Sequence, residues 1–223
     1  MQEIIQDIRR KCRLAMNGIA STSMRQRGLA YKINFGLQIS QIKELASNYK
    51  PDAGLASQLW KEDTRELKIL ATLLYPIAEF TREEANKWVS EVSNQEIREQ
   101  VSLNLFQNLS FAKELAEEWG RSENQNIRAT GYWLLVRLFL TKKMTTEVSV
   151  ETFPSIWDDV ISEDTFLRNS ASLALKHIGR QSSAIAQNIL SKLGVYKNSE
   201  DLVKLEAYNS LAFEFEFYFE DDK

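Results

Sequence analysis

The chain has 223 residues, of which 43% are hydrophobic and 26% charged, a composition ordinary for a folded cytosolic protein. Its single cysteine, Cys12, excludes an internal disulfide and a cysteine metal cluster, and the formal net charge of −3 argues against strong non-specific nucleic-acid binding. No apolar run approaches a membrane span, and the first residues lack the apolar core of a signal peptide. We therefore expect a cytoplasmic protein without a metal or other cofactor.

The charge is distributed unevenly along the chain. Residues 1–50 carry nine Lys or Arg against three acids, a local balance of +6, so the remainder carries −9. A basic end on an acidic body can face phosphate, and Arg25, Arg27 and Lys32 are the candidate phosphate contacts. The alternative is an ordinary solvated helix face.

Helical periodicity recurs along the chain, whereas no strand pattern precedes the C-terminal tail. Apolar positions repeat with helical spacing over 67–77, 112–119 and 167–178, and Gly120 and Gly179 are placed to end the last two of these helices. Thr81 and Ser122 are followed three positions later by Glu84 and Gln125, a spacing typical of capping boxes. The predicted fold class is all-α.

A repeat of 30 to 40 residues becomes visible when five segments are aligned on a basic residue. The aligned residues are Arg65, Arg98, Arg128, Arg168 and Lys204. Small or β-branched residues recur three positions later, at Val101, Gly131, Ala171 and Ala207, where they would let helices approach closely. This pattern resembles HEAT repeats, in which stacked antiparallel helix pairs share a continuous core. We expect one α-solenoid domain over 1–223, with basic N-terminal helices in 1–50.

Within this frame, residues 34 to about 180 resemble the AlkD-type DNA alkylation repair enzymes. The matching segments are Asn34-Phe35-Gly36, Leu55-Ala56, Leu59-Trp60, Arg65-Glu66 and Leu70-Ala71. The resemblance implies a HEAT-like solenoid that holds duplex DNA on its concave face. It also implies a DNA glycosylase, a metal-independent hydrolase that releases cationic N3- and N7-alkylpurines.

The same resemblance assigns site residues. In the segment Asn94-Gln95-Glu96-Ile97-Arg98-Glu99, Glu96 and Glu99 stand where the family has aspartates, and Glu99 would stabilise the charge that develops on the sugar. Gln95 and Leu173 fall where the family has aromatic side chains, so Tyr132 and Trp133 are the candidates for a replacement aromatic wall. Arg128 matches a DNA-contacting arginine, and Arg168 occupies the same position one repeat later.

Each assignment has a structural alternative. Arg98, Arg128 and Arg168 could pair with Asn94, Asn124, Asp164 or their equivalents and form a ladder between repeats. Glu96 and Glu99 could be solvent-facing acids near a helix N-terminus, where the helix dipole favours negative charge. The chain could also be a non-catalytic relative that binds DNA, or a HEAT scaffold that binds a protein or another polyanion.

The C-terminal segment 213–223 alternates phenylalanine with glutamate and carries three consecutive acidic residues at 220–222. A period of two indicates a strand, whereas Phe213 and Phe217 are four residues apart, as in a helix. This acidic aromatic tail could recruit a protein partner. His177 stands in an ordinary repeat helix and is predicted to have no catalytic role.

Overall fold

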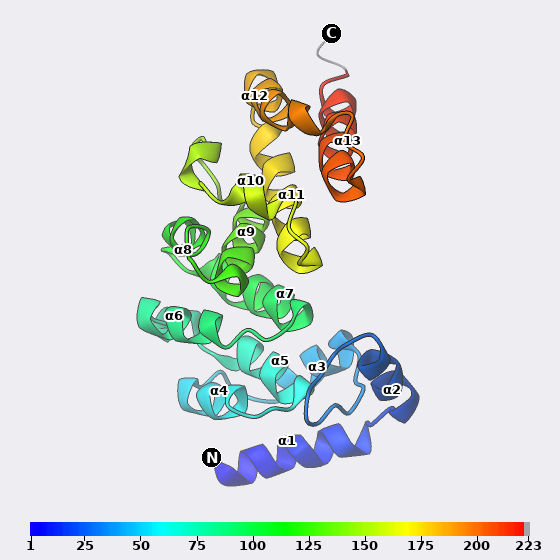
Figure 1. The fold of residues 1–223 in the computed structure, drawn as a ribbon. Coiled ribbons are helices and arrows are strands. Elements are labelled where there is room, and N and C mark those ends of the chain that lie inside the picture. The colour runs from blue at the N-terminus through cyan, green and yellow to red at the C-terminus, as the bar shows by residue number, and fades with distance from the viewer. Residues whose placement is uncertain (221–223) are drawn as a thin grey trace. The chain divides into compact units, whose positions relative to one another are not determined.

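The computed structural model describes residues 1–220, which form thirteen α-helices joined by loops and four short 3-10 turns (Figure 1). Within these residues there is no strand, and one isolated parallel bridge joins Ile33 to Thr64. The all-α prediction is therefore confirmed. In the described part of the chain, no helix is both long and apolar enough to cross a membrane.

The chain divides into two compact units, of which the first is Met1–Leu109 and the second begins at Ser110. The helices of the first unit are α1 (Gln2–Leu14), α2 (Gly18–Gln26), α3 (Ile39–Ala46), α4 (Ala53–Trp60), α5 (Arg65–Leu74), α6 (Arg82–Ser90) and α7 (Gln95–Asn104). Those of the second are α8 (Ala112–Trp119), α9 (Gln125–Leu140), α10 (Ile156–Asp159), α11 (Thr165–Gly179), α12 (Ser183–Leu193) and α13 (Leu202–Tyr218).

Side-chain caps explain where many of these helices begin. Asn94, Asn124, Asp164 and Asp201 accept backbone N–H groups at the starts of α7, α9, α11 and α13. The predicted cap at Thr81 is confirmed, since its hydroxyl accepts from Glu84 N. The predicted cap at Ser122 is wrong by two residues, because Asn124 caps α9 and Ser122 Oγ accepts from Asn124 N.

The basic residues of the aligned segments all lie in the first turn or so of α5, α7, α9, α11 and α13, which supports the repeat derived from the sequence. At one of the small residues of this pattern the helix contact is especially close. A Cβ on Gly131 of α9 would lie 2.3 Å from the backbone N of Gly120. Only glycine at this position lets α9 approach the end of α8 so closely.

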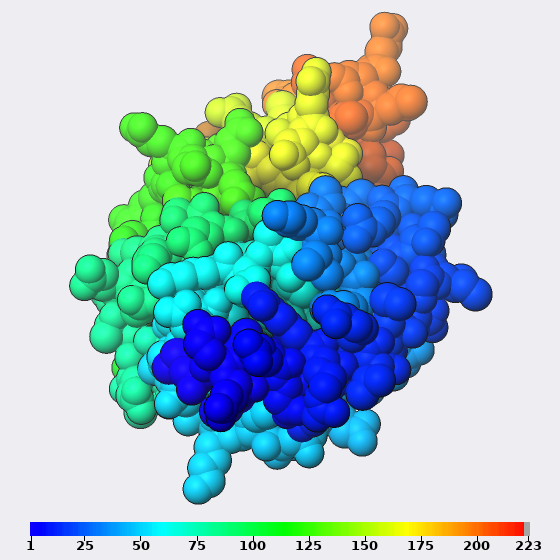
Figure 2. All heavy atoms as spheres, turned by 90° about the horizontal axis from the view of Figure 1, so that it is seen from below, coloured from blue at the N-terminus to red at the C-terminus, as the bar shows by residue number. Residues whose placement is uncertain are grey.

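The first unit is closed on one side by α1, which Figure 2 shows as the dark blue helix nearest the viewer. Ile5, Ile8 and Cys12 form its buried face, as the amphipathic sequence predicts. Arg9 pairs with Glu62 at 2.6 Å, and Tyr49 donates to Asp7 at 2.7 Å. These polar contacts fix α1 to the loop after α4 and to the segment after α3.

In the tail, the helical interpretation is confirmed and the strand interpretation is wrong up to Tyr218, because α13 continues to that residue. Phe215 is buried, whereas Phe213 and Phe217 are exposed. The acidic residues Asp221 and Asp222 of the predicted tail lie outside the described residues.

Candidate functional site

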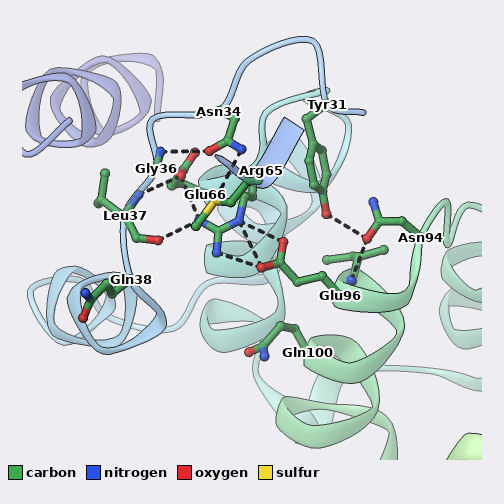
Figure 3. Close-up of polar contacts among 12 residues, drawn as sticks. Tyr31, Asn34, Gly36, Leu37, Gln38, Arg65, Glu66, Asn94, Glu96 and Gln100 are labelled. Atoms are coloured by element: carbon green, nitrogen blue, oxygen red, sulfur yellow. Dashed lines mark hydrogen bonds and ion pairs between the residues drawn. The ribbon is translucent and has the colours of Figure 1, made fainter. Parts of the chain in front are cut away.

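A buried carboxylate holds the loop that carries Asn34-Phe35-Gly36 (Figure 3). Glu66 of α5 is fully buried and accepts the backbone N–H groups of Phe35 at 3.0 Å and Leu37 at 3.2 Å. Asn34 Oδ1 accepts from Gly36 N at 2.8 Å. Gly36 has φ +76°, and a Cβ there would clash with the carbonyl oxygen of Asn17, so this turn requires glycine.

Arg65, the residue before Glu66, ties the same loop to α7. Its Nη1 donates to Leu37 O at 2.7 Å and to Glu66 Oε1 at 3.0 Å. Its Nε and Nη2 donate to Glu96 at 2.8 Å and 2.7 Å, a two-point ion pair. Burial alone would lower the pKa of Arg65, but hydrogen bonds and charge from Glu96 and Glu66 outweigh it and raise the pKa.

The two candidate carboxylates of α7 therefore differ in their partners. Glu96 is committed to Arg65, so it serves as a structural link between α5 and α7. Glu99 is half-buried and accepts Gln95 Nε2 at 2.9 Å, and no ion pair reaches it within residues 1–220. Glu99 is thus the carboxylate of this segment that remains available to a positively charged group.

Around Glu99, the start of α7 is held by Asn94. Its Oδ1 accepts from Ile97 N at 3.1 Å, and the hydroxyl of Tyr31 donates to the same oxygen at 3.4 Å. Burial raises the pKa of Tyr31 to about 12, so this tyrosine stays protonated. Asn94 therefore acts as a helix cap that also connects α7 to the loop after α2.

In the second unit, Arg128 is buried and fully engaged. Nε and Nη2 donate to Asp159 at 2.5 Å and 2.6 Å, and Nη1 donates to Ser122 O at 2.8 Å. The hydroxyl of Tyr132 donates to Asp159 at 2.8 Å. The ladder interpretation of Arg128 is supported, but its partner is Asp159, a residue that sequence reasoning missed, and Asn124 serves as a helix cap instead.

The remaining second-unit candidates differ in accessibility. Tyr132 is fully buried and Trp133 half-buried, with an indole Nε1 that has no hydrogen-bond partner among the described residues. Leu173 is half-buried on α11. Arg168 is half-buried and donates Nη1 to Ser162 O at 2.5 Å. Tyr132 would have to leave its Asp159 contact to form an aromatic wall.

The basic candidates of the first unit are exposed around the end of α2. Arg25 donates weakly to Tyr31 O at 3.5 Å, and Arg27 donates to Ser23 Oγ at 2.8 Å. Neither they nor Lys32 form an ion pair within residues 1–220, whereas Arg9 pairs with Glu62 and Arg10 with Asp7. The free positive charge of this region therefore lies at residues 25–32 more than on α1.

The described residues contain no group of three His, Cys, Asp or Glu side chains arranged to hold a metal ion. His177 of α11 stacks on Phe139 with ring centres 5.8 Å apart. Burial, followed by the nearby Arg180, lowers its pKa, while Glu214 acts in the opposite direction. These contacts give His177 a packing role.

The capped helix repeats, with basic residues at the starts of their helices, define a HEAT-like helical-repeat protein. The chain belongs to the family described as "DNA alkylation repair enzyme", whose sequence model matches residues 20–211. This confirms the resemblance stated above.

A solved structure has the same fold, with a TM-score of 0.69 over 95% of this chain and 94% of its own, at 12% sequence identity. That structure represents "a new family of proteins related to the HEAT-like repeat DNA glycosylases with affinity for branched DNA structures". No curated protein matches the chain.

Proposed function

We propose that this protein binds DNA and hydrolyses the glycosidic bond of cationic N3- and N7-alkylpurines, with Glu99 as the catalytic carboxylate. The observation that carries this proposal is the difference between the two acids of α7. Glu96 is held by Arg65, whereas Glu99 stands at the family's acidic position without an ion pair within residues 1–220.

Hydrolysis of the glycosidic bond requires one negative charge beside the sugar. As a cationic base departs, positive charge builds on the sugar, and a carboxylate beside it stabilises that charge. Flanking aromatic rings would add about 0.5–2 kcal/mol each through cation–π attraction. Gln95 and Leu173 supply no such rings, so we expect slow excision confined to lesions whose leaving group already carries a positive charge.

DNA contact is assigned to the same unit as Glu99. Arg25, Arg27 and Lys32 are exposed and form no ion pair within residues 1–220, so their charges are available to phosphate groups, whereas Arg128 already holds Asp159. Contacts from Arg128 and Arg168 remain a prediction. The affinity of the structural neighbour for branched DNA makes a four-way junction a second substrate form to test beside duplex DNA.

The second candidate function is a non-catalytic one. Gln95 in place of the family's aromatic side chain favours loss of catalysis with retained DNA binding. The exposed Phe213 and Phe217 of α13, beside acidic side chains, favour a protein partner at the C-terminal segment. In that case the chain is a HEAT-repeat scaffold.

Excision from a duplex containing N7-methylguanine tests the proposal. Wild type, Glu99→Gln and the control Glu83→Gln, an exposed acid on α6, are compared for free base released with a chelator present. We expect release by wild type and the control, and a loss of about 100- to 1,000-fold in Glu99→Gln at unchanged DNA affinity. Equal release by wild type and Glu99→Gln removes Glu99 from the mechanism. No release by wild type leaves the non-catalytic candidate.

A further inference from the structure

Helices α9 and α11 begin with the same local sequence pattern, so the surroundings of their first residues can be compared directly. Each follows a Ser-Glu-Asn/Asp sequence whose last residue, Asn124 or Asp164, caps the helix. Four residues after the cap, Arg128 donates Nη1 to Ser122 O and Glu123 O. Arg168 donates Nη1 to the equivalent carbonyls of Ser162 and Glu163. Each arginine is therefore held by an equivalent pair of backbone carbonyl groups.

The Nε–Nη2 edges of the two guanidinium groups have different partners in the two repeats. Arg128 uses Nε and Nη2 to bind Asp159, which lies five residues before the cap Asp164. Five residues before the next cap, Asp201, the chain has Tyr196 instead. No carboxylate forms an ion pair with Arg168 within residues 1–220, and its Nη2 contacts Thr165 Oγ1 at 3.3 Å. The acid that neutralises Arg128 thus has no counterpart at Arg168.

The packing beside the arginine differs as well. Tyr132, four residues after Arg128, is fully buried and donates to Asp159. Its equivalent, four residues after Arg168, is Ser172, which is half-buried. A cavity of about 300 Å³ opens here between α11 and α13, with Arg168, Ser172, Leu202, Ala207 and Ser210 in its lining. The surroundings of Arg168 therefore lack both side chains that pack beside Arg128, the carboxylate of Asp159 and the ring of Tyr132.

We propose that this cavity binds a carboxylate carried on a small apolar group, such as an aromatic acid. The carboxylate would take the place of the Asp159 carboxylate on the Nε–Nη2 edge of Arg168, whose planar fork suits two-point binding of an oxyanion. Ser172 and Ser210 offer hydroxyl donors, and Leu202 and Ala207 offer apolar walls for the ring. The volume falls at the lower end of that of small-ligand sites.

Charge at the cavity favours a carboxylate over phosphate. Glu206 also lines it and is exposed, so a dianion would meet more repulsion there than a monoanion. The lining includes neither Glu99 nor any of residues 25–32, so benzoate binding can be measured without DNA and whether or not the protein excises bases.

The test is a titration of the ¹⁵N-labelled full chain with benzoate, followed by nuclear magnetic resonance of the Arg168 Nε–H group and the backbone amides of α11 and α13. We expect saturable shifts with a Kd on the order of 1 mM, as suits a ligand of few atoms. Arg168→Gln should raise the Kd at least about tenfold, and Arg168→Lys, which keeps the charge but not the fork, should also weaken binding. The exposed control Arg121→Gln should bind as wild type does.

Ser172→Tyr is the second variant, and it leaves Arg168 in place. It places at position 172 the tyrosine that the preceding repeat has at Tyr132. The added ring should fill the cavity and abolish benzoate binding. The thermal stability should be unchanged or higher. It decides the question if Arg168→Gln fails to fold. The proposal is overturned if benzoate gives no saturable shift, or if Arg168→Gln and Ser172→Tyr bind it as wild type does. It is also overturned if inorganic phosphate or a short DNA duplex shifts Arg168 while benzoate does not.

Discussion

Arg128 of α9 and Asp159 of α10 form a buried two-point ion pair, with side-chain exposures of 9% and 4%. The two residues are 31 positions apart, as are Arg65 and Glu96 of the first unit. Each pair joins one repeat to the following one. Two of the polar links between repeats are thus ion pairs made by arginines near helix starts, and these arginines stabilise the fold independently of any ligand.

Removing one partner of the Arg128 pair should destabilise the second unit. Asp159→Asn leaves Arg128 buried without a countercharge and weakens the acceptor for Tyr132, and we expect a loss of about 3 kcal/mol or more in the free energy of unfolding. Urea unfolding measures this loss. Arg128→Gln and the double variant complete a thermodynamic cycle, in which the double loss should be smaller than the two single losses combined. Additive losses would show that the pair is not coupled.

Substitution of Glu96 should lower the stability of the protein, whereas substitution of Glu99 should lower excision and leave the stability nearly unchanged. Glu96→Gln breaks the ion pair with the buried Arg65, and we expect a loss of roughly 2–3 kcal/mol. Glu99→Gln should stay within about 0.5 kcal/mol of wild type, because it retains a hydrogen-bond acceptor for Gln95 and breaks no ion pair. Thermal unfolding of both variants checks this. A large destabilisation by Glu99→Gln would indicate a structural role for this acid.

Much of the fold could be predicted from the sequence because its signals are local. The periodic apolar positions, the Thr81 cap and Gly120 after α8 act within one turn of a helix. The segment around Phe213 is ambiguous in sequence, since alternating Phe and Glu fits a strand. Its helix starts far upstream at the Asp201 cap, and burial of Phe215 together with the Arg180–Glu214 ion pair holds it in place.

The site was less predictable because its decisive contacts are distant in sequence. Glu96 and Glu99 look alike on α7, and only the position of Arg65 on α5 shows that one of them is already paired. Asp159 gives no signal in the sequence, since it lies in a short helix that the repeat alignment does not reach. Arg65-Glu66, by contrast, belongs to the family resemblance, and the structure shows these residues holding loop 34–37.

Stability should fall in mildly acidic solution because of His177. Its ordinary pKa of 6.5 is lowered in the folded state, first by burial and then by Arg180. Below pH 6.5 the unfolded chain therefore binds a proton that the folded chain resists, so the contribution of neutral His177 is complete above that pH and decreases as the pH falls. His177→Phe keeps a ring stacked on Phe139 and should reduce the slope of stability against pH between about 5 and 7. Urea midpoints of both proteins across this range measure it, and identical slopes would assign the pH dependence to other groups.

DNA binding should depend on the exposed basic residues at the end of α2. Reversing Arg25, Arg27 and Lys32 to glutamate removes three charges that no acid within residues 1–220 neutralises. If each contacts a phosphate, fewer counterions are released, and the slope of log K against log salt should become less steep by roughly 3. The affinity loss should be similar for duplexes of unrelated sequence, because phosphate contacts do not distinguish bases. Fluorescence anisotropy across a salt series measures both quantities.

The matched control reverses Lys87, Lys192 and Lys197, three exposed lysines elsewhere in the chain. It changes the net charge by the same amount, so a difference between the two triple variants reports position and not overall repulsion. We expect the control to keep most of the wild-type affinity and its salt slope, because these lysines lie on α6, α12 and the segment after α12. If both variants lose affinity equally, the binding follows net charge alone, and residues 25–32 are not the DNA interface. A four-way junction run beside the duplex then shows whether the same three residues govern binding to branched DNA, since a shared interface predicts the same loss for both forms.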